Sequence, residues 1–222
     1  MIIEFYGTPG AGKTFLAEKI VVQMRSEGIR AKNIVELGRT KIKNKAINKV
    51  VRVLLKVFPK YKRLKTELSQ VVADFASIPA KYNDESIGGF LDNIVYYSFW
   101  YDRLRGKRGV YLFDEGIAHQ YVNMIANYEI TTCEVSKLMG FVSAMPPVVY
   151  VTCEKTVNLD SIQARNRHVC YIDELKGNEL KACINDYCSA CENIREMVSP
   201  ITVRREDSIQ NNIQLIRKNV GV

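Results

Sequence analysis

Two short stretches of the sequence carry residue types that bind phosphate and magnesium. Residues 7–14 read GTPGAGKT, and residues 111–116 read YLFDEG. In the first stretch, glycines allow the backbone to turn consecutive N–H groups toward a phosphate, and the N-terminus of the following helix adds its positive dipole end. Lys13 can bridge the β- and γ-phosphates of a nucleotide, and the Thr14 hydroxyl can bind Mg²⁺. This complete pattern predicts a nucleoside triphosphate site. Its predicted residues are Gly7, Thr8, Pro9, Gly10, Ala11, Gly12, Lys13 and Thr14.

Two adjacent carboxylates, Asp114 and Glu115, follow the apolar residues of the second stretch. Asp114 is predicted to contact the nucleotide-bound Mg²⁺, usually through water, so that Thr14 and Asp114 form the expected metal site. Glu115 has two possible roles: it can take the proton of an acceptor hydroxyl or orient the acceptor, as in a kinase, or it can activate a water for hydrolysis. We favour the acceptor role, with ATP as the substrate and Mg²⁺ as the cofactor.

The alternative interpretation of the same two stretches is an ATPase of the AAA+-like or phage-assembly type. In such a protein Glu115 would polarise water, and the partner would be nucleic acid or a membrane. Two features disfavour this interpretation. The glycine-rich loop begins at residue 7, which leaves no preceding element to pack over an adenine base, and no sensor-like Asn or Thr precedes a helical lid domain.

Strand and helix patterns alternate along the chain, which predicts an α/β fold with a doubly wound parallel sheet. We expect one domain over residues 1–222, with a helical insertion at about 40–105 and a lid at about 163–178. Apolar strands are expected at 1–7, 30–38, 109–116, 146–154 and 200–206. Helices are expected at 15–25 with Gly28 as the stop, at 45–58 ending at Pro59, and at 64–78, 87–105, 155–166, 178–197 and 207–219.

The order of these features resembles a known family. Residues 96–104 read YYSFWYDRL before the Asp114 strand, and residues 146–167 read PPVVYVTCEKTVNLDSIQARNR. Residues 7–14 form the pattern of a phosphate-binding P-loop and precede both segments. This order resembles the thymidylate kinase-like branch of P-loop nucleoside and nucleotide kinases, over residues 1–38 and 95–222. The resemblance implies an ATP-dependent phosphotransferase acting on a nucleotide, a nucleoside or another phosphorylated or hydroxyl acceptor.

The resemblance also implies roles for residues outside the two motifs. Glu36 or Arg39 would lie near the acceptor, Arg103 would contact an acceptor phosphate or sugar, and Arg165 and Arg167 would close over the transferred phosphoryl group. Guanidinium groups suit the last role, because phosphoryl transfer spreads negative charge over the migrating group. This chain has Asp-Glu where thymidylate kinases typically have Asp-Arg, and its 40–94 insertion has no counterpart among them, so the acceptor stays open.

The net charge of +8 comes from one segment. Eleven Lys or Arg and no Asp or Glu lie between Leu37 and Thr66, whereas the other 21 basic residues are outnumbered by 24 acidic ones. The lysines lie on one side of a predicted amphipathic helix. Residues 39–65 therefore have two interpretations: a solvated helix face, or a surface for a polyanion such as nucleic acid or an anionic membrane.

Cysteine usage and hydropathy bear on location and metal binding. No run of about 18 apolar residues exists, and no signal peptide is evident at the N-terminus, so we expect a cytoplasmic protein with reduced thiols. Cys170, Cys183, Cys188 and Cys191 suggest zinc, but they contain only one CxxC pair and the last three fit a buried helix face, which we favour. His119 and His168 are isolated and are expected to be structural or exposed rather than catalytic.

Overall fold

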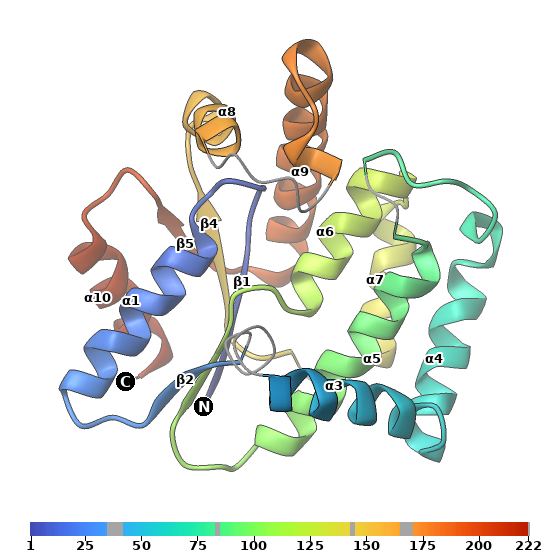
Figure 1. The fold of residues 1–222 in the computed structure, drawn as a ribbon, viewed down its shortest axis with the longest axis horizontal. Coiled ribbons are helices and arrows are strands. Elements are labelled where there is room, and N and C mark those ends of the chain that lie inside the picture. The colour runs from blue at the N-terminus through green and yellow to red at the C-terminus, as the bar shows by residue number, and fades with distance from the viewer. Residues whose placement is uncertain (35–41, 83–84, 143–144, 165–170, 222) are drawn as a thin grey trace.

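The computed structural model describes residues 1–34, 42–82, 85–142, 145–164 and 171–221, and for residues 42–48 it describes the backbone alone. In the described chain, five parallel strands form one sheet in the order β2-β3-β1-β4-β5 (Figure 1). The doubly wound α/β architecture predicted from the sequence is confirmed. The strands are β1 (Ile2–Tyr6), β2 (Ala31–Asn33), β3 (Val110–Phe113), β4 (Val148–Thr152) and β5 (Ile201–Arg204).

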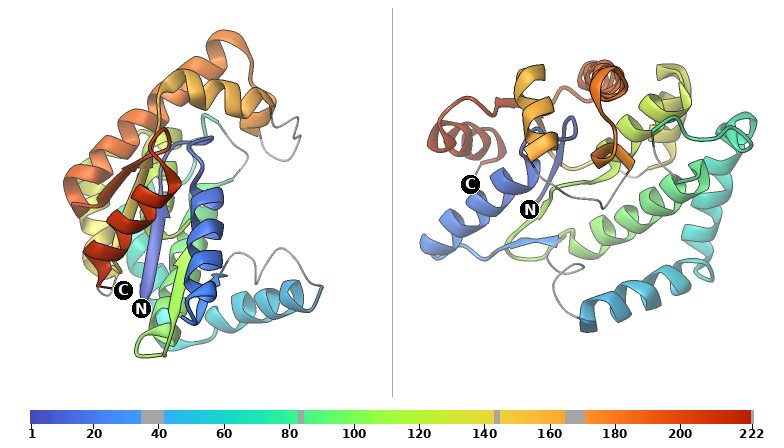
Figure 2. Two further views of the ribbon diagram at one scale, coloured as in Figure 1. Left: turned by 90° about the vertical axis from the view of Figure 1, so that its left-hand side faces the viewer. Right: turned by 45° about the horizontal axis from the view of Figure 1, so that its top comes forward.

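Helices cover both faces of the sheet (Figures 1 and 2). One face packs against α1 (Lys13–Ser26) and α10 (Ile209–Val220), and the other against α5 (Ile87–Leu104), α6 (Ile117–Tyr128) and α9 (Gly177–Val198). Side chains alternate between the faces along each strand. On β1, Ile3 and Phe5 join the core under α1, whereas Tyr6 joins the core under α6.

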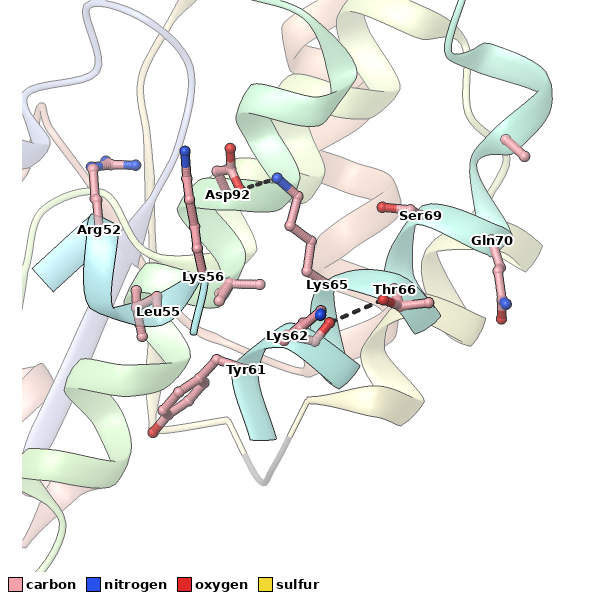
Figure 3. Close-up of a pocket in the computed structure, with 12 residues that line it drawn as sticks. Arg52, Leu55, Lys56, Tyr61, Lys62, Lys65, Thr66, Ser69, Gln70 and Asp92 are labelled. Atoms are coloured by element: carbon pink, nitrogen blue, oxygen red, sulfur yellow. Dashed lines mark hydrogen bonds and ion pairs between the residues drawn. The ribbon is translucent and has the colours of Figure 1, made fainter. Parts of the chain in front are cut away.

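The helices between β2 and α5 form an additional layer. It contains α3 (Ile42–Leu55), α4 (Pro59–Val71) and a 3₁₀ turn at Ala73–Phe75, and it packs on α5 through Leu55, Leu64 and Leu68. These helices enclose a cavity together with α5 (Figure 3). The remaining elements are α7 (Thr132–Phe141), α8 (Lys155–Ala164) and a 3₁₀ turn at Tyr171–Asp173.

Most expected elements are present, with corrections between β2 and α5: β2 ends at Asn33, and the helix expected at 64–78 is α4, which ends at Val71. Helix α1 ends before Gly28, which has a φ of 78° and is followed by a hydrogen bond from the Ile29 N–H to the Met24 carbonyl oxygen. The basic helix, however, ends at Leu55 and not at Pro59. Pro59 instead begins α4, because a proline at the first helical position lacks only an N–H that would have no partner there.

Candidate active site

The loop between β1 and α1 has the geometry of a phosphate cradle. Gly7 and Gly12 have φ values of 153° and 92°, which side chains rarely allow. A Cβ on Gly7 would lie 2.2 Å from the backbone oxygen of Val151 on β4. The buried Lys13 ammonium group donates hydrogen bonds to the carbonyl oxygens of Gly7 and Thr8, at 3.0 and 3.2 Å. Its charge is therefore folded back onto the loop that the sequence predicts to bind phosphate.

Thr14 and Asp114 come together at the carboxyl ends of β1 and β3. The Thr14 hydroxyl donates a 2.8 Å hydrogen bond to Asp114 Oδ2, although the two residues are 100 positions apart. A hydroxyl and a carboxylate are oxygen ligands of the kind that Mg²⁺ prefers, and Mg²⁺ is usually bound by one or two such groups together with substrate phosphates. The donor set therefore fits a magnesium ion held jointly with a nucleotide.

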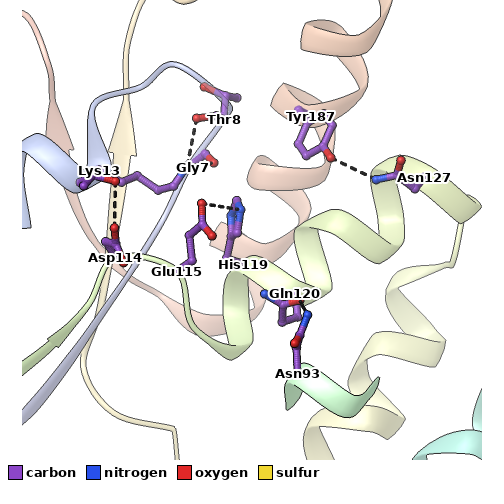
Figure 4. A network of polar contacts seen from close by, with 11 residues as sticks. Gly7, Thr8, Lys13, Asn93, Asp114, Glu115, His119, Gln120, Asn127 and Tyr187 are labelled. Atoms are coloured by element: carbon purple, nitrogen blue, oxygen red, sulfur yellow. Dashed lines mark hydrogen bonds and ion pairs between the residues drawn. The ribbon is translucent and has the colours of Figure 1, made fainter. Parts of the chain in front are cut away.

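Glu115 lies at the start of α6, beside a buried histidine (Figure 4). Its side chain is 39% exposed, and its Oε1 atom is 3.8 Å from His119 Nε2, one helical turn on. Burial, together with the nearby charge of Lys13, holds the pKa of His119 well below its usual value. His119 is therefore a neutral imidazole against the Glu115 carboxylate. The sequence predicted a structural or exposed histidine and did not predict that His119 lies beside Glu115.

A buried glutamate on β1, Glu4, contacts the segment that leads from Glu115 into α6. Glu4 is 0% exposed, accepts a 2.5 Å hydrogen bond from the Tyr101 hydroxyl, and accepts another from the Ala118 N–H at the start of α6. Burial raises its pKa to about 7, against the lowering effect of these hydrogen bonds. Gly116 passes so close that a Cβ would lie 2.4 Å from the Glu4 carboxyl carbon. Glycine is thus needed at 116 for close approach, not for a positive φ, since its φ is −127°.

A cavity of about 600 Å³ lies on the other side of the P-loop, and a second set of contacts holds the loop there. Arg205, just after β5, donates hydrogen bonds to the Gly10 carbonyl oxygen at 2.7 Å and to the Ser161 hydroxyl at 2.5 Å. Asn158 on α8 donates a 2.8 Å hydrogen bond to the Thr8 hydroxyl. The sequence motifs gave no signal for these residues. Gly10, Gly12, Phe15, Ser161, Ala164, Arg205 and Asn212 all line this cavity.

A short row of two amides, Gln120 on α6 and Asn93 on α5, leads from α6 toward α3 (Figure 4). The Asn93 side chain on α5 donates to Gln120 Oε1 at 3.2 Å and to Glu85 Oε1 at 2.9 Å, and it accepts a 2.8 Å hydrogen bond from Arg52 on α3. The charges of Arg52 and Glu115 both affect the pKa of Glu85, which is raised chiefly by burial. The row therefore connects the Glu115 side of the site with the basic helix.

Comparison with known proteins identifies the fold. The sequence matches no protein-family model and no curated protein sequence. A structure of the M. mycoides deoxyadenosine kinase, with the products dCMP and a flexible dCDP, aligns with 100% of this chain and 99% of its own at 15% identity and a TM-score of 0.54. The same kinase with bound dATP aligns over 100% of both chains at 15% identity and a TM-score of 0.51. The chain therefore shares the fold of this kinase.

Shikimate kinase from Acinetobacter baumannii is a more distant neighbour, at 12% identity, a TM-score of 0.48, and coverage of 98% of this chain and 93% of its own. At such identities the likeness to solved structures concerns the fold. The conclusions on chemistry therefore depend on the side chains around the P-loop.

The structure separates one predicted residue from this site. Arg103 is exposed near the C-terminus of α5, where it borders a small cavity of about 220 Å³ with Val51 and Phe99. Helix α5 leads into the amino end of β3, whereas the P-loop follows the carboxyl end of β1. Because β1 and β3 are parallel, Arg103 and the P-loop lie at opposite edges of the sheet. The prediction that Arg103 contacts the acceptor therefore has no support in this geometry. Four further predicted residues lie outside the described chain: Glu36, Arg39, Arg165 and Arg167.

The cysteines of α9 pack as the helical spacing indicated. Cys183 and Cys191 are buried in the core, and burial raises the pKa of Cys191. Within the described ranges no group of three or more His, Cys, Asp or Glu is placed to hold a metal, and Cys170 lies outside them. Among the described helices, none is both long enough and apolar enough to cross a membrane.

Proposed function

We propose that the protein is an ATP-dependent phosphotransferase that acts on a nucleotide, a nucleoside or another phosphorylated or hydroxyl acceptor. One observation carries the proposal. Glu115 is partly exposed beside the Lys13, Thr14 and Asp114 set, and Figure 4 shows a short row of two hydrogen-bonded amides, Gln120 and Asn93, on the neighbouring helices. Such a row can hydrogen bond to the polar edges of an acceptor and hold its hydroxyl near the carboxylate.

Each side chain then has a role in the transfer. Lys13 leaves its carbonyl partners and neutralises phosphate charge, and Thr14 and Asp114 hold Mg²⁺. When bound, that ion neutralises charge on the β- and γ-phosphate oxygens. Glu115 accepts the proton of the acceptor hydroxyl or orients it. The neutral His119 lies one helical turn from Glu115 and does not compete for the proton, because burial holds its pKa well below its usual value.

The cavity bordered by Arg205 is proposed to hold the nucleoside part of ATP. It begins at Gly10 and Gly12 of the P-loop and is lined from α1 and α10, on the sheet face opposite α6, so the nucleoside of ATP and the acceptor would lie on different sides of the γ-phosphate. Ala164, the last residue of α8, lines the same cavity. This supports the proposal that residues 163–178 form a lid whose Arg165 and Arg167 act on the transferred phosphoryl group.

A transfer assay tests the proposed reaction. Purified protein is incubated with radiolabelled ATP, Mg²⁺ and four acceptor classes: nucleosides, nucleoside monophosphates, phosphorylated sugars, and oligonucleotides with a 5′-hydroxyl. We expect label on one class and slow hydrolysis without it, because Glu115 lacks its acceptor. The fold is compatible with a nucleoside acceptor, since the M. mycoides neighbour is a deoxyadenosine kinase. Brisk hydrolysis in the absence of every acceptor, with no transfer to any, would establish the ATPase alternative instead.

A polyanion partner at residues 39–65 is a second proposal. Lys49, Lys56 and Lys62 are exposed in the described part of this segment. We expect modest polyanion binding that weakens steeply with salt. Reversing Lys49, Arg52 and Lys56 to Glu should weaken it and leave ATP binding unchanged; equal polyanion binding by the two proteins would reduce the segment to a solvated face. Because the proposed reaction uses ATP and Mg²⁺, we propose that the protein acts in the cytoplasm.

A further inference from the structure

A cavity of about 570 Å³ lies between α3, α4 and α5, apart from the P-loop cavity (Figure 3). The two cavities share no lining residue. Its volume is in the range of small-molecule sites. Buried apolar side chains of Leu55 and Val95, 6% and 4% exposed, form part of the wall together with Tyr61. The cavity therefore offers an apolar surface large enough for a ring or a short alkyl chain.

Positive charge lines the cavity. Among the described residues, four basic side chains line it and one carboxylate, Asp92, which forms a 2.5 Å ion pair with Lys65. Figure 3 shows Arg52 and Lys56 projecting from α3 on the same side. Lys62 on α4 is exposed, and the Thr66 and Ser69 hydroxyls line the same wall. The excess of cations over carboxylates favours an anionic ligand.

The Arg52 side chain is held at the α5 edge of the cavity. Its guanidinium lies 4.7 Å from the centre of the Tyr96 ring and donates a 2.8 Å hydrogen bond to Asn93 Oδ1. Stacking and a hydrogen bond reduce the rotamer freedom that binding would otherwise remove. Its other N–H groups can bind an oxyanion, because a guanidinium carries five donors in a fixed plane.

We propose that this cavity binds a phosphate monoester with an apolar or aromatic body. The phosphate is placed at the basic side chains of α3 and α4, Lys56 and Lys62 among them, and the body on Leu55 and Val95. The apolar wall distinguishes this site from the polyanion surface proposed above, which needs charge alone. The proposal does not depend on the proposed transfer reaction, since binding is measured without ATP or an acceptor.

Calorimetry with the Lys13→Ala protein tests the proposal, because that background weakens phosphate binding at the P-loop. The probes are hexyl phosphate, phenyl phosphate, inorganic phosphate and hexanol. Hexyl or phenyl phosphate should bind at least about tenfold more tightly than inorganic phosphate, since burial of a few CH₂ groups or a ring contributes more than 1.4 kcal/mol. Hexanol should bind no better than inorganic phosphate. The preferred organic phosphate identifies the body as alkyl or aromatic.

Three variants in the same background locate the binding. Lys56→Glu combined with Lys62→Glu should weaken organic phosphate binding by about tenfold or more. The matched control is Lys107→Glu with Lys181→Glu, two exposed lysines elsewhere with the same total charge change, and it should bind like its parent. Ser69→Phe fills the cavity from an exposed position and should abolish the preference for an organic body.

Two results would overturn the proposal. Equal affinity for inorganic and organic phosphate would remove the apolar wall from the interaction, and equal losses in the two lysine pairs would reduce it to general electrostatics. Circular dichroism of each variant shows whether it is folded. If the Lys56 and Lys62 pair does not fold, Ser69→Phe alone decides, because it leaves every charge in place.

Discussion

Replacing Glu4 by Gln should change how the stability of the protein depends on pH. The folded-state pKa of Glu4 is about 7, against an ordinary value of 4.5 for glutamate, because the carboxyl is fully buried. A group with a raised pKa contributes stability that is fully present below its unfolded pKa and is lost as pH rises through its folded pKa. Since one pKa unit corresponds to about 1.4 kcal/mol, Glu4 should account for a loss of about 3 kcal/mol between pH 4.5 and about pH 7.

Glutamine imitates the protonated form of this side chain. Its carbonyl oxygen can accept from the Ala118 N–H, and its amide can donate to the Tyr101 oxygen, so the two contacts of Glu4 survive without a charge. Urea unfolding of both proteins at several values between about pH 5 and pH 8 measures the effect. The variant should gain stability relative to the wild type as pH rises, and the gain should level off above about pH 7.5.

The difference between the two proteins isolates Glu4 from other titrating groups. Glu85 has a raised pKa, and its contribution has the same sign. His119 is held neutral by burial, so its contribution has the opposite sign and is lost as pH falls. Both are common to the wild type and the variant. Glu27→Gln, at an exposed carboxylate whose pKa is lowered by Arg217, should give no such trend above pH 5. A difference between wild type and Glu4→Gln that is constant over the whole range would refute the reasoning.

Four further changes test the site. Lys13→Ala should abolish stabilisation by ATP and Mg²⁺ in a thermal-shift assay, whereas Lys19→Ala should not; equal nucleotide affinity would contradict the role of Lys13. Arg205→Ala should weaken ATP binding by about tenfold in calorimetry, compared with little change for Arg204→Ala outside the cavity. Gly116→Ala should destabilise by at least about 1–3 kcal/mol in urea unfolding because of the Glu4 contact, while Gly140→Ala, with open space around it, should not. Glu115→Gln should lower phosphoryl transfer by about 10²–10⁴ and change ATP affinity much less; fast acceptor-free turnover lost in this variant would indicate a hydrolase.

The sequence predicts well those parts of the site that are formed by residues close together in the chain. The phosphate loop needs glycines, a lysine and a hydroxyl within eight positions, and its neighbours need only an apolar strand and an amphipathic helix. Asp114 is predictable for a related reason, because carboxyl ends of parallel strands meet at one edge of the sheet. Pro59 shows the limit of local patterns: a proline fits both the end of one helix and the start of the next, and the chain uses it for the second.

The residues that sequence reasoning missed make contacts far apart along the chain. Glu4 and Tyr101 are separated by 97 positions, Thr8 and Asn158 by 150, and Gly10 and Arg205 by 195. No spacing rule connects such pairs in a single sequence. Glu4 nevertheless leaves a trace, because a glutamate in the middle of an otherwise apolar strand is rarely buried without partners.

The strand pattern explains where that glutamate finds its partners. Ile3 and Phe5 face α1, so Glu4 must face the opposite side of β1, where α6 begins directly after Glu115 and Gly116. The start of a helix presents free N–H groups and a positive dipole end to a carboxylate, which is the interaction that Glu4 makes. Glu4 accepts the Ala118 N–H at the beginning of α6, and His119 lies 3.8 Å from Glu115, one helical turn further along. Glu115, the carboxylate proposed to take the acceptor's proton, therefore lies between a helix start held by Glu4 and the buried His119. Changes in either of these two residues should alter transfer before they alter nucleotide binding.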